Sequence, residues 1–399
     1  MKLLWVKSGF LHPTTKGGHI RSLEMLRRLH TRHEIHYVGF NPPGETEGPR
    51  RSAEYCSRAH PVPLRLAPKT SPLFYLDLIA GLLDPLPVAV GRYRSRAMRD
   101  LIARLRLEQR FDRIVCDFLV PAPNITALSD CVLFQHNVET TIWRRHLEEA
   151  SNPLHRLYFR LQTARMFRFE RRVCRTVRHV VAVSAADASR MKEMFGVTGV
   201  SQIPTGVDPE YFAPPPAATP VADLIFIGSM DWIPNIDGVA YFVREILPLI
   251  RNNRPATTLA IVGRDPAPSI QALARQDPRI RVTGTVPDVR PYLWGSAISI
   301  VPIRVGGGTR LKIYESMAAS TAVVSTTIGA EGLEVRDPDN ICIADTPGTF
   351  AARCVYLLEN PARRAQQAAA ARDLVVRRFS WDHVAACFEE ILTAAGGRA

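Results

Sequence analysis

Residues 302–315, PIRVGGGTRLKIYE, combine residue types that suit the binding of a diphosphate. They follow an apolar run at 298–301, which predicts a strand, and they lead into residues 309–319, whose apolar spacing predicts a helix. Glycines at such a turn let backbone N–H groups approach an anion closely. The segment therefore predicts phosphate contacts from Gly306, Gly307, Gly308 and Thr309.

The charged residues of the same segment extend this prediction. Arg304, Arg310 and Lys312 supply the positive charge that a pyrophosphate leaving group needs in the transition state. Lys312 and Glu315 are three residues apart and so share one helix face. A carboxylate at Glu315 can accept two hydrogen bonds from a ribose diol. The alternative interpretation is a glycine-rich turn followed by an ordinary ion pair.

Two weaker signals follow predicted strands in the first half of the chain. Gly17 and Gly18 come after the apolar run at 3–6 and open a predicted helix, a position that favours anions. His136, in QHNVE, comes directly after the run at 132–135, where it can bind a sugar hydroxyl or take part in proton transfer. The alternatives are a plain tight turn and a histidine that only satisfies nearby backbone groups.

A third loop follows the predicted strand at 223–227 in the second half. Gly228, Ser229 and Asn235, in IGSMDWIPN, have the pattern of a loop that contacts phosphate or sugar, without a complete glycine fingerprint. Asn235 or Asp237 can equally be only the N-cap of the next helix.

The charge of the chain is unevenly distributed. The net charge is +13, and residues 1–200 contain 32 of the 51 Lys and Arg but only 18 of the 38 Asp and Glu. Such asymmetry indicates an anionic partner for the first half, for which nucleic acid, an acidic polymer and an anionic membrane are candidates. An arginine-rich face in contact with water alone is the alternative.

The cysteines and the apolar segments indicate where the protein works. Seven cysteines without CxxC pairs or metal-ligand spacing predict free thiols in a reducing compartment and no metal. The N-terminal apolar run is too short for a signal peptide, and the stretch 72–90 is interrupted by aspartates and prolines. We therefore expect a cytoplasmic protein, with peripheral attachment to the inner face of the cell membrane as a further expectation.

Short apolar runs alternate with longer amphipathic ones, which predicts α/β architecture with parallel sheets. The expected strands are 3–6, 35–40, 114–116, 132–135, 180–183, 223–227, 258–262, 280–283, 298–301, 322–325 and 341–343. The expected helices are 18–29, 96–109, 154–175, 236–251, 269–275, 289–295, 309–319 and 349–359. Consecutive prolines at 214–216 predict an extended connector. The chain thus divides into domains at 1–205 and 222–376, a linker at 206–221, and a final segment at 377–399.

Several motifs together resemble the family-4 glycosyltransferases. The matching pieces are FIGSMDWIPNIDG at 226–238, IVG at 261–263, GTVPD at 284–288, GGGTRLKIYESMA at 306–318 and TIGAEG at 327–332. Upstream, VSAAD at 183–187 and IPTGVD at 203–208 are similar to the end of the family's first domain, and FSW at 379–381 to the start of its last helix.

The resemblance implies the GT-B fold: two Rossmann-like domains, a cleft between them, and a C-terminal helix that crosses back to the N-terminal domain. It also implies retaining, metal-independent transfer of a sugar from a nucleotide diphosphate sugar to an acceptor hydroxyl, with the leaving phosphate taking the acceptor's proton. Glycan, lipid-linked and small-molecule acceptors all fit it. Glu315 matches the family's ribose-binding Glu, and His136 its N-domain histidine near the transferred sugar. Gly17 and Gly18 match its glycine loop, while Gly263 and Val286 lie in matching donor-site segments.

The sequence departs from the family pattern at two positions. Gly307 stands where the first Glu of the E-x7-E motif is usual, which indicates a GGGT-bearing branch. Ser229 begins the segment where the family carries an Arg/Lys pair. We infer that Arg310 and Lys312, with Arg304, take over the neutralisation of phosphate.

Two other functions fit parts of the sequence. A nucleotide-sugar epimerase has a similar fold, but it needs acidic and basic residues on either side of the sugar, which are not evident. A nucleic-acid-binding protein would use the arginines and aromatic residues of 156–178. The apolar residues there recur at helical spacing, so an amphipathic helix with a solvated face fits better and makes nucleic acid an unlikely partner. An anionic membrane contacted through 73–90 and Arg92, Arg94, Arg96 and Arg99 is the preferred partner of the basic half.

Overall fold

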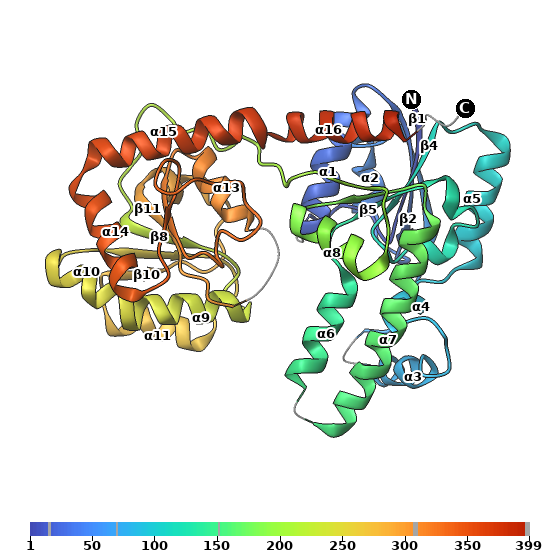
Figure 1. The fold of residues 1–399 in the computed structure, drawn as a ribbon, viewed down its shortest axis with the longest axis horizontal. Helices are drawn as coiled ribbons and strands as arrows, with labels where there is room; N and C mark the ends of the chain where they lie inside the picture. Colours follow the sequence, from blue (N-terminus) through green and yellow to red (C-terminus); the bar gives the residue numbers. More distant parts are fainter. Residues whose placement is uncertain (15–16, 69–70, 151, 306–309, 396–399) are drawn as a thin grey trace. The chain divides into compact units, whose positions relative to one another are not determined.

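The computed structural model describes residues 1–399 except 15–16, 69–70, 151, 306–309 and 396–399. The chain forms two compact units. Unit 1 consists of Met1–Pro204 and Val384–Ala399, and unit 2 of Thr205–His383. Each unit is built around its own parallel sheet (Figure 1).

The described part of unit 1 contains a seven-stranded parallel sheet in the order β3-β2-β1-β4-β5-β6-β7. The strands between the two edges are mostly buried, as parallel sheets covered on both faces require. Its principal elements are β1 (Lys2–Lys7), α1 (Gly17–His30), β2 (Glu34–Asn41), β3 (Arg58–Pro63), α3 (Pro72–Ala80), α4 (Val88–Gly91), α5 (Arg96–Glu108), β4 (Arg113–Asp117), β5 (Cys131–Gln135), α6 (Glu139–Glu149), α7 (Pro153–Thr176), β6 (His179–Ala182), α8 (Ala185–Phe195) and β7 (Val200–Gln202).

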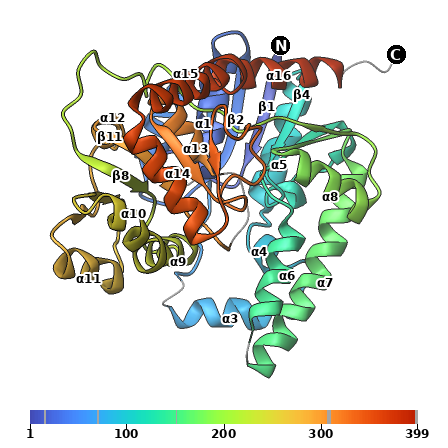
Figure 2. The same cartoon turned by 60° about the vertical axis from the view of Figure 1, so that its left-hand side comes forward.

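Two features of unit 1 lie outside the sheet and its covering helices. Helices α6 and α7 run side by side as a hairpin that extends beyond the sheet, and α3 lies beside that hairpin in both views (Figures 1 and 2). Most of the last helix, α16 (Trp381–Ala394), belongs to unit 1. There Phe388 is fully buried, with its ring centroid 5.8 Å from that of Trp5 and 5.0 Å from that of Phe134.

The described part of unit 2 contains a six-stranded parallel sheet in the order β10-β9-β8-β11-β12-β13. In both sheets the order reverses at the unit's first strand, β1 or β8, which is the doubly wound Rossmann-like pattern. The elements are β8 (Ala222–Ile227), α9 (Ile233–Tyr241), α10 (Leu247–Asn253), β9 (Leu259–Val262), α11 (Pro268–Gln276), β10 (Ile280–Val282), α12 (Arg290–Trp294), β11 (Ser296–Val301), α13 (Leu311–Ala318), β12 (Ala322–Ser325), β13 (Cys342–Ile343), α14 (Pro347–Glu359) and α15 (Pro361–Arg378).

The expected strands and helices are all present, with shifted ends and one interruption. The single helix expected at 236–251 is divided by a π-helical turn at Phe242–Ile246. Pro248, two residues further on, has no N–H to bond the preceding turn, which accounts for the widened geometry. The last helix, α16, starts at Trp381, within the FSW segment expected at its beginning, and residues 377–378 still belong to α15.

The segment expected as a linker, 206–221, is held by unit 2. Val207 pairs with Ser380 in an isolated parallel bridge, and its side chain is buried. Phe212 is buried in the core of unit 2, where its carbonyl accepts a hydrogen bond from Trp294 Nε1 at 2.9 Å.

Neither a membrane-spanning helix nor a cluster suited to a metal is found within the described ranges. None of their helices combines the length and the apolar character needed to cross a bilayer. Among the same residues, no three or more His, Cys, Asp or Glu side chains are grouped so that they could hold a metal ion. All seven cysteines are free, and six of them are buried.

Candidate functional site

The loops after β8 and β11 leave the carboxyl edge of the unit 2 sheet where the strand order reverses. Ligands of doubly wound sheets bind at this position. Gly228 and Ser229 follow β8 directly, and Arg310 and Lys312 stand at the start of α13, which follows the loop after β11. The topology therefore brings the loop after β8 and the start of α13, which are far apart in the sequence, to one edge of the sheet.

Lys312 and Asn235 are the centre of this group. Lys312 Nζ donates a hydrogen bond to Asn235 Oδ1 at 2.9 Å and lies 4.2 Å from the ring centroid of Phe226. Asn235 Nδ2 in turn donates to the carbonyl of Ser229 at 2.8 Å. Asn235 is buried at the start of α9, and its amide therefore joins the lysine of α13 to the loop after β8.

Glycine is required at two positions for this arrangement. A Cβ on Gly228 would lie 2.7 Å from Lys312 Nζ and 2.7 Å from Asn235 Nδ2. A Cβ on Gly263, which follows β9, would lie 1.7 Å from the Gly228 carbonyl oxygen. Any side chain at Gly263 would push the Gly228 loop away from β9, so these two glycines fix the floor of the site.

The site combines two basic side chains with one carboxylate. Arg310 is buried, and its guanidinium lies 5.1 Å from the ring centroid of Trp232. Lys312 and Glu315 are partly exposed. Burial, with Arg310 nearby, lowers the pKa of Lys312 to about 7, against the opposing effect of Glu315. Burial also raises the pKa of Glu315, which Lys312 partly offsets. A bound anion would stabilise the charged form of Lys312, which the neighbouring Arg310 disfavours.

The remaining predicted residues of unit 2 lie as follows. Arg304 is held against α9, with an ion pair to Asp237 at 2.7 Å and its guanidinium 4.2 Å from the ring centroid of Tyr241. It would have to exchange that ion pair to contact a phosphate. Val286 follows β10 and is partly buried against the core. Gly306, Gly307, Gly308 and Thr309 lie outside the described residues.

A hollow of about 630 Å³ lies at the opposite edge of the unit 2 sheet. It is lined by residues at the amino ends of β8, β11 and β12, together with Trp294 and Arg364. Ligands of this fold bind at the carboxyl ends of the strands, so we do not assign this hollow to the site.

In unit 1, the predicted residue His136 is bonded to a buried carboxylate. His136 Nε2 is 2.8 Å from Asp117 Oδ1, at the carboxyl end of β4. The same carboxylate accepts from Lys7 Nζ at 2.7 Å, from Trp5 Nε1 at 2.8 Å and from Ser22 Oγ at 2.6 Å. Burial would raise the pKa of Asp117, but Lys7 and His136 outweigh it and hold that pKa well below its usual range.

The ionised Asp117 determines what His136 can do. Since a carboxylate only accepts, His136 must carry its proton on Nε2, which leaves Nδ1 as an acceptor. Burial lowers the pKa of His136 to about 4 despite Asp117, so the ring is neutral at pH 7. Nδ1 is buried without a hydrogen-bond partner among the described residues and lies 3.5 Å from where a Gly18 Cβ would stand. His136 and Gly18 are thus adjacent, and Gly17 begins the same helix, α1.

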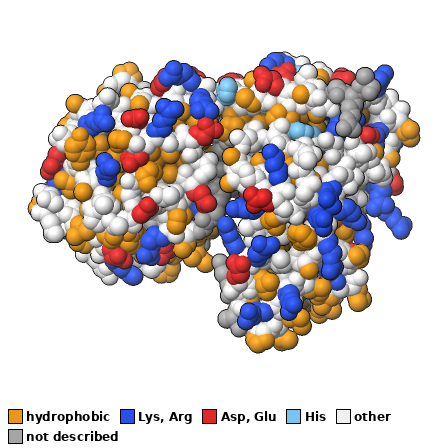
Figure 3. Space-filling view, in the orientation of Figure 1, with side chains coloured by type: hydrophobic (Ala, Val, Ile, Leu, Met, Phe, Trp, Pro, Cys, Tyr) orange, Lys and Arg blue, Asp and Glu red, His pale blue; other side chains and the backbone are white. Residues whose placement is uncertain are grey.

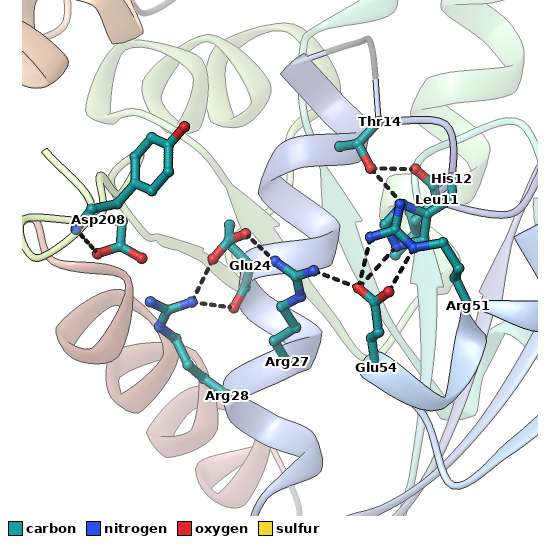
Figure 4. A network of polar contacts seen from close by, with 10 residues as sticks. Leu11, His12, Thr14, Glu24, Arg27, Arg28, Arg51, Glu54 and Asp208 are labelled. Atoms are coloured by element: carbon teal, nitrogen blue, oxygen red, sulfur yellow. Dashed lines mark hydrogen bonds and ion pairs between the residues drawn. The ribbon is translucent and has the colours of Figure 1, made fainter. Parts of the chain in front are cut away.

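Residues 11–14, which follow β1, are held by the polar network of Figure 4. Thr14 Oγ1 donates to the Leu11 carbonyl at 2.9 Å and lies 3.1 Å from His12 Nδ1. His12 Nε2 lies 3.3 Å from Glu54, which also binds Arg51 and Arg27 (Figure 4). The bond to Arg51, with those to Arg27 and His12, lowers the pKa of Glu54 to about 2. The Glu54 carboxylate is therefore ionised at neutral pH and keeps its contacts with Arg51, Arg27 and His12.

Sequence reasoning did not identify Asp117, Glu170 or Trp232. Asp117 had a usable signal, because an aspartate that ends a buried strand stands at the same edge as His136. Glu170 lies within α7, and no feature of the sequence distinguishes it from the other polar residues of that helix. It accepts from the backbone N–H groups of Glu139 and Thr140, which start α6. Burial and Glu170 together raise the pKa of Glu139 to about 7.

Comparison with known proteins assigns both halves of the chain to glycosyltransferase families. The model of the family "Glycosyltransferase Family 4" matches residues 15–211, and that of "Glycosyl transferases group 1" matches residues 222–360. The chain is similar to an uncharacterized 44.6 kDa protein in the cps region of Klebsiella pneumoniae, with 22% identity over 145 residues. It is also similar to glycogen synthase of Mycobacterium tuberculosis, with 25% identity over 229 residues.

The two curated relatives match only in part, whereas the structural likeness extends over the whole chain. The matched regions cover 35% of this chain and 37% of the Klebsiella protein, and 54% of this chain and 54% of glycogen synthase. The structure of Anabaena Alr3699/HepE in complex with UDP superimposes with a TM-score of 0.68 and 13% identity, over 99% of this chain and all of that one. With both family models matched in order along the two Rossmann-like units, the chain belongs to the family-4, group 1 glycosyltransferases of the GT-B fold.

Proposed function

We propose that this glycosyltransferase binds a nucleotide diphosphate sugar at the carboxyl edge of the unit 2 sheet and transfers the sugar to an acceptor hydroxyl with retention of anomeric configuration. The observation that carries the proposal is that two basic side chains, the buried Arg310 and the partly exposed Lys312, stand together near Glu315 at the start of α13. In the proposed complex the diphosphate lies against the two cations and the ribose diol donates to Glu315.

The chemistry then needs little from side chains. The bond between the anomeric carbon and the diphosphate oxygen breaks, and Arg310 and Lys312 stabilise the charge that develops on that oxygen. The acceptor oxygen forms the new bond to the anomeric carbon on the same face. Its proton passes to the departing diphosphate, so the step is balanced without a protein base. Its retaining outcome and its independence of metal are part of the proposal.

His136 has a narrower role in this proposal than proton transfer. A neutral imidazole whose Nε2–H is bonded to Asp117 presents only the Nδ1 lone pair to a ligand. We assign it the acceptance of a hydrogen bond from a sugar hydroxyl. A histidine with a pKa of about 4 is a poor general acid at pH 7.

The choice of donor and acceptor draws on the relatives. The Anabaena structure was solved with UDP, which makes uridine diphosphate sugars the first donors to test. The Klebsiella protein is described as lying in the cps region, which supports a role in envelope polysaccharide or glycolipid synthesis.

The proposal is tested by a thermal-shift screen of nucleoside diphosphates and nucleotide sugars. A ligand at about 100 times its Kd stabilises the folded state by about 2.7 kcal/mol, a shift that such a screen detects. We expect one base to stand out, and a double variant, Arg310→Met with Lys312→Met, to lose the shift. No shift with any nucleotide would refute the donor site.

The stereochemical outcome is tested once the donor is known. NMR of the product must then show the same anomeric configuration as in the donor. An inverted product, or epimerised donor in the absence of acceptor, would refute the proposed reaction.

A further inference from the structure

Helix α3 presents its apolar side chains to solvent instead of to the core. None of its residues is buried. The exposed side chains recur at intervals of three and four residues, so they form one outward stripe that continues just past the helix end. The stripe consists of Leu73 (62% exposed), Tyr75 (60%), Leu76 (59%), Ile79 (62%), Leu82 (40%) and Leu83 (91%).

Polar contacts hold the helix in this orientation. Arg165 of α7 donates to the carbonyls of Gly81 and Leu82 at 2.8 and 2.6 Å. Arg92 lies 4.9 Å from the ring centroid of Phe74 and 3.6 Å from Asp77. The helix is thus held at its middle and just past its C-terminal end. The stripe can be covered only by something outside unit 1.

The adjoining hairpin has a second exposed apolar row. Leu154, Leu157 and Leu161 of α7 are 76%, 67% and 37% exposed, at spacings of three and four residues. Exposed arginines stand between and opposite them, namely Arg144 and Arg145 on α6 and Arg156 and Arg160 on α7. The lower part of unit 1 accordingly shows orange and blue side chains intermixed (Figure 3).

Apolar stripes with arginines beside them are the composition of surfaces that lie in the headgroup region of an anionic bilayer. The leucines enter the acyl boundary while the guanidinium groups bind lipid phosphates. The excess of 14 positive charges in residues 1–200 would attract the same membrane from a distance.

We propose that α3, together with the α6–α7 hairpin, is a membrane-docking surface for anionic phospholipid. This surface is independent of the nucleotide site, because all its residues belong to unit 1. It would keep the enzyme at a membrane where a lipid-linked acceptor is found. Failure of the proposed transfer reaction would leave this proposal standing.

The test is flotation of the full chain with vesicles of phosphatidylcholine alone or mixed with phosphatidylglycerol. We expect binding to the mixed vesicles, weakened by salt because screening removes the attraction. The double variant Leu73→Asp/Leu76→Asp should lower the partition coefficient by about tenfold or more. The matched control is Leu107→Asp on α5, which is also exposed, at 89%, but lies outside this surface.

Three outcomes would overturn the proposal. They are equal binding to both kinds of vesicle, unchanged binding of the α3 double variant, and loss of binding in the Leu107→Asp control. A concentration-dependent dimer that the α3 double variant abolishes would assign the stripe to a second copy of the chain instead. Unchanged melting temperatures establish that the variants fold. As an independent measurement, brominated lipid should quench the added fluorescence of Leu76→Trp but not that of Leu107→Trp.

Discussion

Lys312 is the residue whose protonation should report on donor binding. Its pKa of about 7 in the free protein reflects burial and the neighbouring Arg310, and a bound diphosphate would raise it. The lysine is then charged in the complex over a wider pH range than in the free protein. Its contribution to affinity is complete below pH 7 and is lost as pH rises from 7 towards the raised pKa.

We predict that binding of the nucleoside diphosphate at pH 8 takes up about one proton, measured by calorimetry in buffers of different ionisation enthalpy. Lys312→Met should abolish the uptake and weaken binding by about 10- to 100-fold, the value of a hydrogen bond to a charged group. Lys192→Met, at an exposed lysine on α8, should change neither. Proton uptake that persists without Lys312 would contradict this interpretation.

Asp117 is predicted to position His136 by fixing its tautomer. Nitrogen-15 NMR of the native protein should show His136 protonated on Nε2. Asp117→Asn should give a mixture of tautomers and lower kcat by about 10- to 100-fold, with little change in the KM of the donor. Ser22→Ala removes another partner of the same carboxylate and should leave the tautomer intact. A native His136 protonated on Nδ1 would disprove this role.

The sequence singles out candidate residues for these sites, but it does not indicate which side chains contact them. Lys312, Glu315 and His136 follow strands at positions where chemistry is expected, and the motif spacing identified them. Asn235 is hydrogen-bonded to Lys312, and Asp117 to His136. Both contacts depend on which parallel strands are neighbours in the sheet, and the local sequence does not determine that order. Arg304 was grouped with Arg310 by proximity in sequence, and its ion pair with Asp237 could not be foreseen.

At the scale of elements, the floor of the unit 2 site depends on the close approach of the loops after β8 and β9. Gly263→Ala should destabilise the protein by about 1–3 kcal/mol, because its Cβ would collide with the Gly228 backbone, and should weaken nucleotide binding. Gly348→Ala on α14 meets no atom within 4 Å and should stay within about 0.5 kcal/mol of the native stability. Chemical denaturation measures both. A fully stable Gly263→Ala protein would refute the argument.

The elements that sequence reasoning missed have identifiable causes. Strand β3, RAHPVP, contains two prolines and an arginine, a composition tolerated only because it is an edge strand. Helix α3 was recognised only as an apolar stretch, because its apolar residues face outward and its sequence alone does not distinguish that from burial. Helices α6, α8 and α15 are polar over much of their surface and offer few apolar residues to mark them.

At the scale of the whole molecule, unit 1 is completed by a segment from the far end of the chain. Besides Phe388, α16 contributes Glu389, which pairs with Arg32 at 2.7 Å and His33 at 2.8 Å, and the Leu392 carbonyl, which accepts from Arg113 at 2.6 Å. The core of unit 1 therefore includes residues from both sides of the whole of unit 2, Thr205–His383, in the sequence.

Phe388→Ala should destabilise unit 1 by about 3–5 kcal/mol through the cavity that it leaves. Hydrogen exchange should become faster in β1 and β5, while β8 and β9 stay protected. Val376→Ala on α15, whose side chain is 42% exposed, should leave both units within about 0.5 kcal/mol of native. Equal loss of protection in both units would contradict the assignment of this segment to unit 1.

The return of α16 also affects how the protein is made. During synthesis, the aromatic side chains of Trp5 and Phe134 cannot be covered until Phe388 has left the ribosome, whereas all of unit 2 precedes that point. The contiguous second unit can therefore fold first, and the first unit must wait with part of its core open. In this chain the usual order of folding from the N-terminus is reversed, and the nascent N-terminal unit is the part that most needs a chaperone.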